Sequence, residues 1–226
     1  MFKSVLHILF NSIEQRPQKD LFRFFRDHQW QYWSYQQVGE KVRLLTHGLM
    51  ARGLQKGDRI AILSNNLPEW PITDFAIFGL QGVVVPIYPT LTPPQIAYIL
   101  KDAQVTAIFV QDALQYDKIA AIEKEVTSLE QVFSYEPLTG VVNFDKLLEE
   151  GQAHAEAFPG AFEESMESID PEALCSLVYT SGTTGEPKGV MLCHRGFVFD
   201  IVNSEARLGL RSDDVFLSFL PLSHLY

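Results

Sequence analysis

The stretch YTSGTTGEPKG, from Tyr179 to Gly189, combines residue types that can bind an anion. Its three glycines permit backbone conformations in which successive N–H groups face one concavity. Hydroxyl side chains add further donors, and a lysine adds a mobile positive charge. The alternative is a glycine-containing hairpin whose lysine is only solvated. The candidate phosphate-binding residues are Thr180, Ser181, Gly182, Thr183, Thr184, Gly185 and Lys188.

Apolar residues on both sides place this stretch between two strands, Ala173 to Tyr179 and Gly189 to Cys193. The common nucleotide-binding P-loop instead runs from a strand directly into a helix. Pro187 opposes a helix start here, because proline lacks an N–H and restricts the residue before it. We therefore expect a phosphate site that does without a helix N-terminus.

His224 is the other side chain that we single out, after Pro221, Leu222 and Ser223. On residue types alone, a histidine in this setting is more often structural than functional. His194 and Arg195 precede a helix that we expect to begin at Gly196 or Phe197, so we assign them capping or packing roles.

The elements that must position these residues alternate along the chain. The segment LFRFFRDHQWQYWSY predicts two aromatic strands around a polar turn, followed by a helix that Ser34 opens and Gly53 closes. We expect its aromatic residues, together with Trp70 and Tyr88, to lie in the core. Further strands are expected at Arg59 to Leu63, Val83 to Ile87, Val105 to Val110 and Gln131 to Ser134, with helices near Pro68, from Pro93, and from about Asp112 to Val126. Continuous apolar strands that alternate with helices predict an α/β fold, with mostly parallel sheets covered by helices on both faces.

Composition and charge limit the function classes. The chain has 226 residues, 46% of them hydrophobic, and a formal charge of −10, which argues against nucleic acid as a partner. Residues 145–172 hold nine acids and one lysine. We expect an amino-terminal subdomain at 1–140, an acidic helical or loop connection at 141–172, and the start of a second subdomain at 173–226.

The cysteines and the amino-terminal segment bear on the cellular compartment and on zinc binding. Two cysteines without C-x-x-C spacing suggest neither a disulfide framework nor a zinc site, and favour the cytoplasm. The start of the chain has the spacing of an amphipathic helix, with Phe2, Val5, Leu6, Leu9 and Ile13 on one face. We expect this helix to pack on the domain, and peripheral membrane contact is the alternative.

The longer stretch YTSGTTGEPKGVMLCHRG resembles the phosphate-binding signature of the adenylate-forming, or AMP-binding, superfamily, which includes acyl-CoA synthetases and firefly luciferase. The segments GDRIAILSNNLPEW, GVVVPIYPTLTPPQIAYIL and FLSFLPLSHLY are similar to other parts of the same family. The resemblance covers the chain from about Trp30 onward. The forms PIYPT and LPLSHLY most resemble the long-chain fatty acid–CoA ligases.

The resemblance implies a two-step reaction. A fatty acid carboxylate attacks ATP to give acyl-AMP and pyrophosphate, and coenzyme A then takes the acyl group as a thioester. Residues Thr180 to Thr184 and Gly185 would enclose the β- and γ-phosphates, Lys188 would add charge, and Mg²⁺ would bridge the triphosphate oxygens. His224 would line the acyl and pantetheine site and position substrate. No metal ligand is assigned in this chain.

Members of the family continue well past the position of Tyr226. Their magnesium-linked glutamate, ribose-binding aspartate and catalytic lysine have no counterpart in this sequence. We therefore expect the amino-terminal, truncated portion of the adenylate-forming fold, inactive on its own. The alternatives are a stand-alone binding or interaction module, or a ligase that uses acyl carrier protein or another carboxylic acid.

Overall fold

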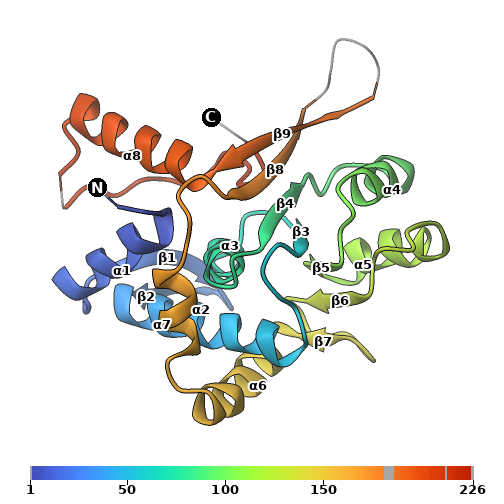
Figure 1. The fold of residues 1–226 in the computed structure, drawn as a ribbon, viewed down its shortest axis with the longest axis horizontal. Coiled ribbons are helices and arrows are strands. Elements are labelled where there is room, and N and C mark those ends of the chain that lie inside the picture. Colours follow the sequence, from blue (N-terminus) through green and yellow to red (C-terminus); the bar gives the residue numbers. More distant parts are fainter. Residues whose placement is uncertain (1, 181–185, 212, 225–226) are drawn as a thin grey trace.

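The computed structural model describes residues 2–180, 186–211 and 213–224. Within this part of the chain, seven strands form one sheet in the order β7-β6-β5-β3-β4-β8-β9 (Figure 1). Neighbouring strands run parallel except for β8 and β9, which are antiparallel. The strands are β3 (Arg59–Leu63), β4 (Val83–Ile87), β5 (Ala107–Val110), β6 (Gln131–Ser134), β7 (Val142–Asn143), β8 (Leu174–Thr180) and β9 (Lys188–Cys193).

Helices cover both faces of this sheet, as Figure 1 shows. Alternate residues of β3 separate the two cores: Ile60 and Ile62 pack on one face, and Ala61 and Leu63 on the other. The first face carries α1 (Val5–Gln15), α2 (Tyr35–Ala51), α3 (Glu69–Gly79), α6 (Phe144–Ala157) and α7 (Ala161–Glu167); the second carries α4 (Pro93–Asp102) and α5 (Ala113–Ala120). Helix α8 (His194–Leu208) follows β9 and contacts α1. The predicted α/β class with a mostly parallel sheet is confirmed.

Local capping signals set several helix ends as predicted. Ser34 and Gln37 form a reciprocal capping box at the start of α2: the Ser34 hydroxyl accepts from the Gln37 N–H, and the Gln37 side chain accepts from the Ser34 N–H. Gly53 follows the helix with a φ of 81°, a conformation that favours glycine. The spacing of polar residues was therefore sufficient to locate this helix.

Three expected boundaries are wrong. Strand β5 begins at Ala107 rather than at the expected Val105. The Val105 N–H bonds to the Leu100 carbonyl and closes α4. Helix α5 ends at Ala120 and a 3₁₀ turn follows at Glu123–Glu125, an end that no proline or glycine marks in the sequence. Helix α8 begins at His194, before the expected start, and the Arg195 N–H bonds to the Pro171 carbonyl.

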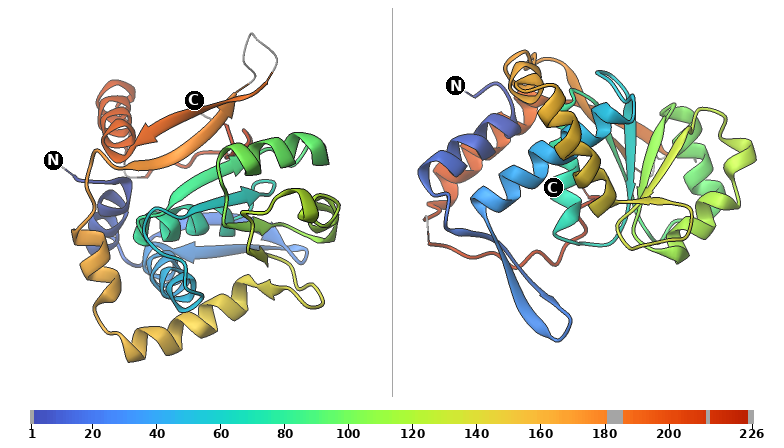
Figure 2. Two further views of the ribbon diagram at one scale, coloured as in Figure 1. Left: turned by 45° about the vertical axis from the view of Figure 1, so that its right-hand side comes forward. Right: turned by 90° about the horizontal axis from the view of Figure 1, so that it is seen from below.

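The aromatic strands form a separate hairpin of β1 (Asp20–Arg26) and β2 (Gln29–Ser34), which projects from the helices in the right-hand view of Figure 2. The expectation that its aromatic residues are core is wrong for one face. Phe25, Trp30 and Tyr32 are 59%, 62% and 49% exposed. Alternation along the strands points Phe22 and Trp33 toward the core and these three away from it. Trp70, by contrast, is buried as expected.

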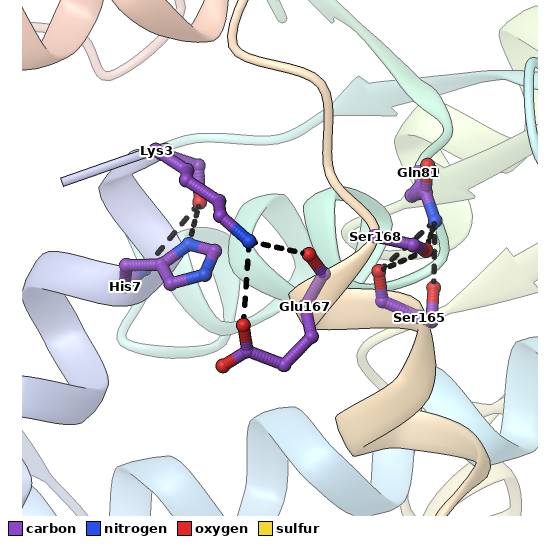
Figure 3. Close-up of polar contacts among 7 residues, drawn as sticks. Lys3, His7, Gln81, Ser165, Glu167 and Ser168 are labelled. Atoms are coloured by element: carbon purple, nitrogen blue, oxygen red, sulfur yellow. Dashed lines mark hydrogen bonds and ion pairs between the residues drawn. The ribbon is translucent and has the colours of Figure 1, made fainter.

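The amino-terminal helix packs on the domain, as predicted. Leu6 and Leu9 of α1 are buried in the core, and Lys3 Nζ donates a 2.7 Å hydrogen bond to the Glu167 carbonyl of α7 (Figure 3). Figure 3 also shows Gln81 joined to Ser165 and Ser168, so polar contacts hold α7 at two points. No helix in the described ranges is long and apolar enough to cross a membrane.

The division at residues 140 and 172 stays a prediction. The acidic segment supplies α6 and α7, which pack against α2. The residues from 173 onward supply β8 and β9 to the same sheet as the preceding strands. Within the described ranges, the three expected segments therefore share one sheet and its covering helices.

Candidate functional site

Thr180, the first of the predicted phosphate-binding residues, lies where a parallel strand ends. Strand β3 ends at Leu63, β4 at Ile87 and β8 at Thr180, and parallel strands present their carboxyl ends at one edge of a sheet. In open α/β sheets, ligands bind outside that edge. The structure thus brings the strand that enters the glycine-rich stretch together with the loops that follow β3 and β4.

The glycine-rich stretch leaves and re-enters the sheet through paired strands, as predicted. Thr180 is the last residue of β8, and Lys188, the first residue of β9, is its register partner. Both residues are exposed, so a hydroxyl group and an ammonium group are available at the base of the loop for an anionic ligand. The other predicted phosphate-binding residues, Ser181, Gly182, Thr183, Thr184 and Gly185, lie outside the described residues.

Helix α4 holds both sides of this loop. The Tyr98 hydroxyl donates a 3.1 Å hydrogen bond to the Pro187 carbonyl, just before β9. The Tyr179 hydroxyl, near the end of β8, donates a 2.5 Å hydrogen bond to the Asp102 carboxylate. Burial, together with this hydrogen bond, raises the pKa of Tyr179, so the hydroxyl keeps its proton at neutral pH.

Sequence reasoning missed these anchoring residues. Tyr98 and Asp102 are four positions apart and therefore share one face of α4. That spacing was the available signal, but nothing in the sequence showed that the loop would lie against this face. Gly189 lets the Tyr179 ring lie against the backbone of β9. Any larger residue there would place its Cβ only 3.2 Å from the ring.

His224 lies beside a small cavity. Its ring meets the ring of Tyr88 edge to face, with 6.0 Å between the centroids, and its backbone N–H bonds to the Pro221 carbonyl. The cavity has a volume of about 200 Å³. It is lined by Trp70, Asp74, Val84, Pro86, Ser176, Val178, Phe197, Leu222, Ser223 and His224. Most of this lining is apolar, with a few polar groups among the apolar side chains, as in many small-molecule sites.

Asp74 is the acidic residue of this cavity. It belongs to α3, whose sequence EWPITDFAIFG is otherwise mostly apolar, and burial raises the pKa of Asp74 to about 7. Trp70 Nε1 and Ser223 Oγ are buried and have no hydrogen-bond partner in the described part of the chain. Sequence reasoning missed Asp74, although a carboxylate in the middle of a mostly apolar helix was a usable signal.

The described residues offer no ready-made metal centre. Among them, no group of three or more histidine, cysteine, aspartate or glutamate residues is placed to hold a metal ion. The donors at the base of the loop, a hydroxyl and an ammonium group, suit phosphate oxygens rather than a cation.

Comparisons with known proteins agree on one family. Residues 9–226 match the family described as AMP-binding enzyme. A long-chain fatty acid–CoA ligase from Mycobacterium bovis is 31% identical over 224 residues, which cover 98% of this chain and 37% of the relative. One from Rattus norvegicus is 32% identical over 236 residues, covering 98% of this chain and 32% of the relative. The chain thus spans about a third of the length of these curated relatives.

Solved structures share the fold. ATP-bound MatB from Rhodopseudomonas palustris superposes with a TM-score of 0.77 at 25% identity, over 99% of this chain and 41% of that one. A long-chain fatty acid–CoA ligase from Archaeoglobus fulgidus gives a TM-score of 0.77 at 21% identity, over 98% of this chain and 43% of that one.

Proposed function

Because the chain belongs to the family of AMP-binding enzymes, we propose that it is the amino-terminal part of a ligase that activates a long-chain fatty acid with ATP. The acceptor of the acyl group is coenzyme A. The observation that carries the proposal is the pairing of Thr180 with Lys188 at the carboxyl end of a parallel strand, on either side of a glycine- and threonine-rich loop. The names of the related ligases support the choice of substrate.

The chemistry proceeds in two displacements. A carboxylate oxygen of the fatty acid attacks the α-phosphorus of ATP, and the bond to the departing pyrophosphate breaks. The thiolate sulfur of coenzyme A then attacks the acyl carbon, and AMP leaves with the electron pair of the broken C–O bond. Negative charge grows on pyrophosphate in the first step, so fixed donors around the β- and γ-phosphates lower the barrier.

The chain's own residues serve the first displacement. The hydroxyl and N–H groups of Thr180, Ser181, Gly182, Thr183, Thr184 and Gly185 bind the β- and γ-phosphates. Lys188 supplies positive charge from β9, and the two tyrosine contacts to α4 hold the ends of the loop. A magnesium ion bound to the triphosphate would offset further charge.

His224 lines the acyl and pantetheine site and positions the substrate. Its place beside the cavity with Asp74, and its edge-to-face contact with Tyr88, support this role. At about 200 Å³ the cavity is too small for a whole long acyl chain, so its apolar lining would contact only the part of the chain next to the carboxyl group. Peripheral contact with a membrane, from the cytoplasm, is part of the proposal, and the exposed Phe25 and Trp30 offer apolar side chains for it.

The test is pyrophosphate release by a protein that contains this chain and continues as its relatives do. Acids of graded chain length are supplied with ATP, with and without coenzyme A, and thioester is measured separately. We expect release with long-chain acids, and thioester only with coenzyme A. Release with short acids alone would overturn the substrate, and thioester only with acyl carrier protein would overturn the acceptor. No release with any acid would favour a binding module.

A further inference from the structure

One side chain joins the end of β3 to the segment that carries His224. Asn66 Nδ2 donates hydrogen bonds to the carbonyl of Leu220 at 2.8 Å and to that of Ser218 at 3.4 Å. Asn66 Oδ1 accepts a hydrogen bond of 2.9 Å from the Leu222 N–H. A single carboxamide therefore bonds to three backbone groups within residues 218–222, more than 150 positions away in the chain.

These hydrogen bonds matter because residues 213–220 have little packing of their own. Val215, Phe216, Leu217 and Phe219 are 69–84% exposed. Burial begins only afterwards, at Leu222 and Ser223, next to the cavity. Asn66 therefore binds the Leu222 N–H at the point where the exposed segment ends and the chain enters the lining of the cavity.

The chemistry of the contact requires an amide. Two carbonyl groups need donors and one N–H group needs an acceptor. A carboxamide supplies two N–H donors and an acceptor oxygen, whereas a hydroxyl group has a single O–H donor. Aspartate would keep the acceptor but place a carboxylate oxygen against the two carbonyl oxygens. Alanine would leave the three backbone groups without this partner.

We propose that Asn66 is a positioning residue that fixes residues 218–224, and through them sets the place of the His224 imidazole against Tyr88 and the cavity. The structural half of this inference stands alone. Its catalytic half, that Asn66 sets the place of the acyl group, rests on the proposed function.

The structural half is tested on residues 1–226 by NMR of ¹³C-labelled histidine. The His224 signal is assigned with His224→Gln, and its dependence on the neighbouring ring with Tyr88→Leu. We expect Asn66→Ala to move the His224 signal toward its position in the unfolded chain, and Asn66→Asp, which sets a carboxylate oxygen against two carbonyl oxygens, to move it in the same direction. Asn65→Ala is the matched control, because the adjacent Asn65 amide bonds instead to Gln111.

Asn65→Ala must leave the His224 signal in place. If Asn66→Ala leaves the signal unchanged, or if both alanine variants move it equally, the inference is overturned. Should Asn66→Ala fail to fold, Asn66→Asp decides by the same signal. A fold that is intact by circular dichroism with a displaced His224 signal supports the inference.

The catalytic half is tested in a protein that continues as the relatives do. Water replaces part of the three lost hydrogen bonds in this exposed segment, so we expect Asn66→Ala to lower kcat/KM for the fatty acid about tenfold, with the KM for ATP unchanged. If the KM for ATP and the KM for the fatty acid rise by the same factor, a role at the acyl site is contradicted. If the parent protein releases no pyrophosphate, the proposed function fails, whereas the NMR experiment still decides the role of Asn66.

Discussion

The Tyr179 hydroxyl donates a 2.5 Å hydrogen bond to Asp102, which ties the strand that enters the candidate phosphate loop to the last turn of α4. The Tyr98 hydroxyl makes the corresponding contact on the far side of the loop, at the Pro187 carbonyl. Both ends of the loop are therefore held by α4, although the sequence of the loop does not indicate that Tyr98 and Asp102 are its partners. Loss of the neutral Tyr98 hydrogen bond costs about 1 kcal/mol, and loss of the Tyr179 hydrogen bond to a carboxylate costs about 2 kcal/mol.

Removing these contacts is expected to loosen the ends of the loop. Asp102→Ala and Tyr98→Phe should speed amide hydrogen exchange in the peptide that covers residues 179–189, measured by mass spectrometry. Asp102→Asn, which keeps an acceptor for the Tyr179 hydroxyl, should preserve most of the protection. Tyr32→Phe, on the exposed hairpin, is the control. Equal exchange in the parent and all variants would contradict the anchoring role.

Asp74 should make the protein less stable as the pH rises. Its carboxyl titrates near pH 4 in an unfolded chain, whereas burial raises the pKa of Asp74 to about 7 in the folded protein. Between these values the folded state binds more protons, so the free energy of unfolding falls as the pH rises from about 4 to about 7. Asp74→Asn should remove this fall and gain about 2 kcal/mol at pH 8, a figure that allows for partial solvent contact.

Urea denaturation at pH 5 and pH 8 measures the effect of Asp74, with the exposed Asp117→Asn as the matched control. An unchanged difference between the two pH values in Asp74→Asn would show that this carboxyl is not the group responsible.

His194 should act in the opposite direction. Burial, with the charge of nearby His7 as a second cause, lowers the pKa of His194 to about 4. The unfolded chain takes up this proton near pH 6.5, so stability is lost as the pH falls from about 6.5 to about 4. His194→Gln should spare about 2 kcal/mol of that loss at pH 5. The exposed His28→Asn serves as control, and equal acid sensitivity in all three proteins would refute the prediction.

Gly151 allows α6 to lie directly against α2. A Cβ at this position would overlap the Leu44 carbonyl oxygen of α2. Gly151→Ala should therefore lower the free energy of unfolding by about 3 kcal/mol, since neither backbone can move without disturbing the core. Gly196→Ala is the matched control in α8, where a Cβ meets nothing within 4 Å, and alanine there should be neutral or stabilising. Equal denaturation midpoints for the two variants would contradict the packing argument.

Local signals in the sequence were enough for much of the fold. Continuous apolar runs located β3 and β4, capping residues located α2, and Pro187 indicated that the loop leads into a strand. These features act within a few residues of one another, so they can be read without knowing the fold. The wrong boundary at Val105 arose where a residue serves a helix end instead of the strand ladder.

Contacts between distant segments could not be predicted in the same way. Asn66 bonds to residues more than 150 positions away, and Tyr98 bonds to a carbonyl 89 positions away. The exposed face of the hairpin was also missed, because Phe25 and Trp30 have the apolar character of core residues. Which face of an aromatic strand is covered depends on the whole fold, not on the strand.

The central claim is that the loop between β8 and β9 binds the phosphates of ATP during acyl-AMP formation. Fatty acid-dependent exchange of labelled pyrophosphate into ATP tests it most directly, in a protein that continues as the relatives do. We predict exchange in the parent and in the exposed-lysine control Lys124→Ala, and losses in Lys188→Ala and Thr183→Ala of up to about 3 kcal/mol in barrier height, or roughly a hundredfold. Exchange at the parental rate in both loop variants would contradict the claim.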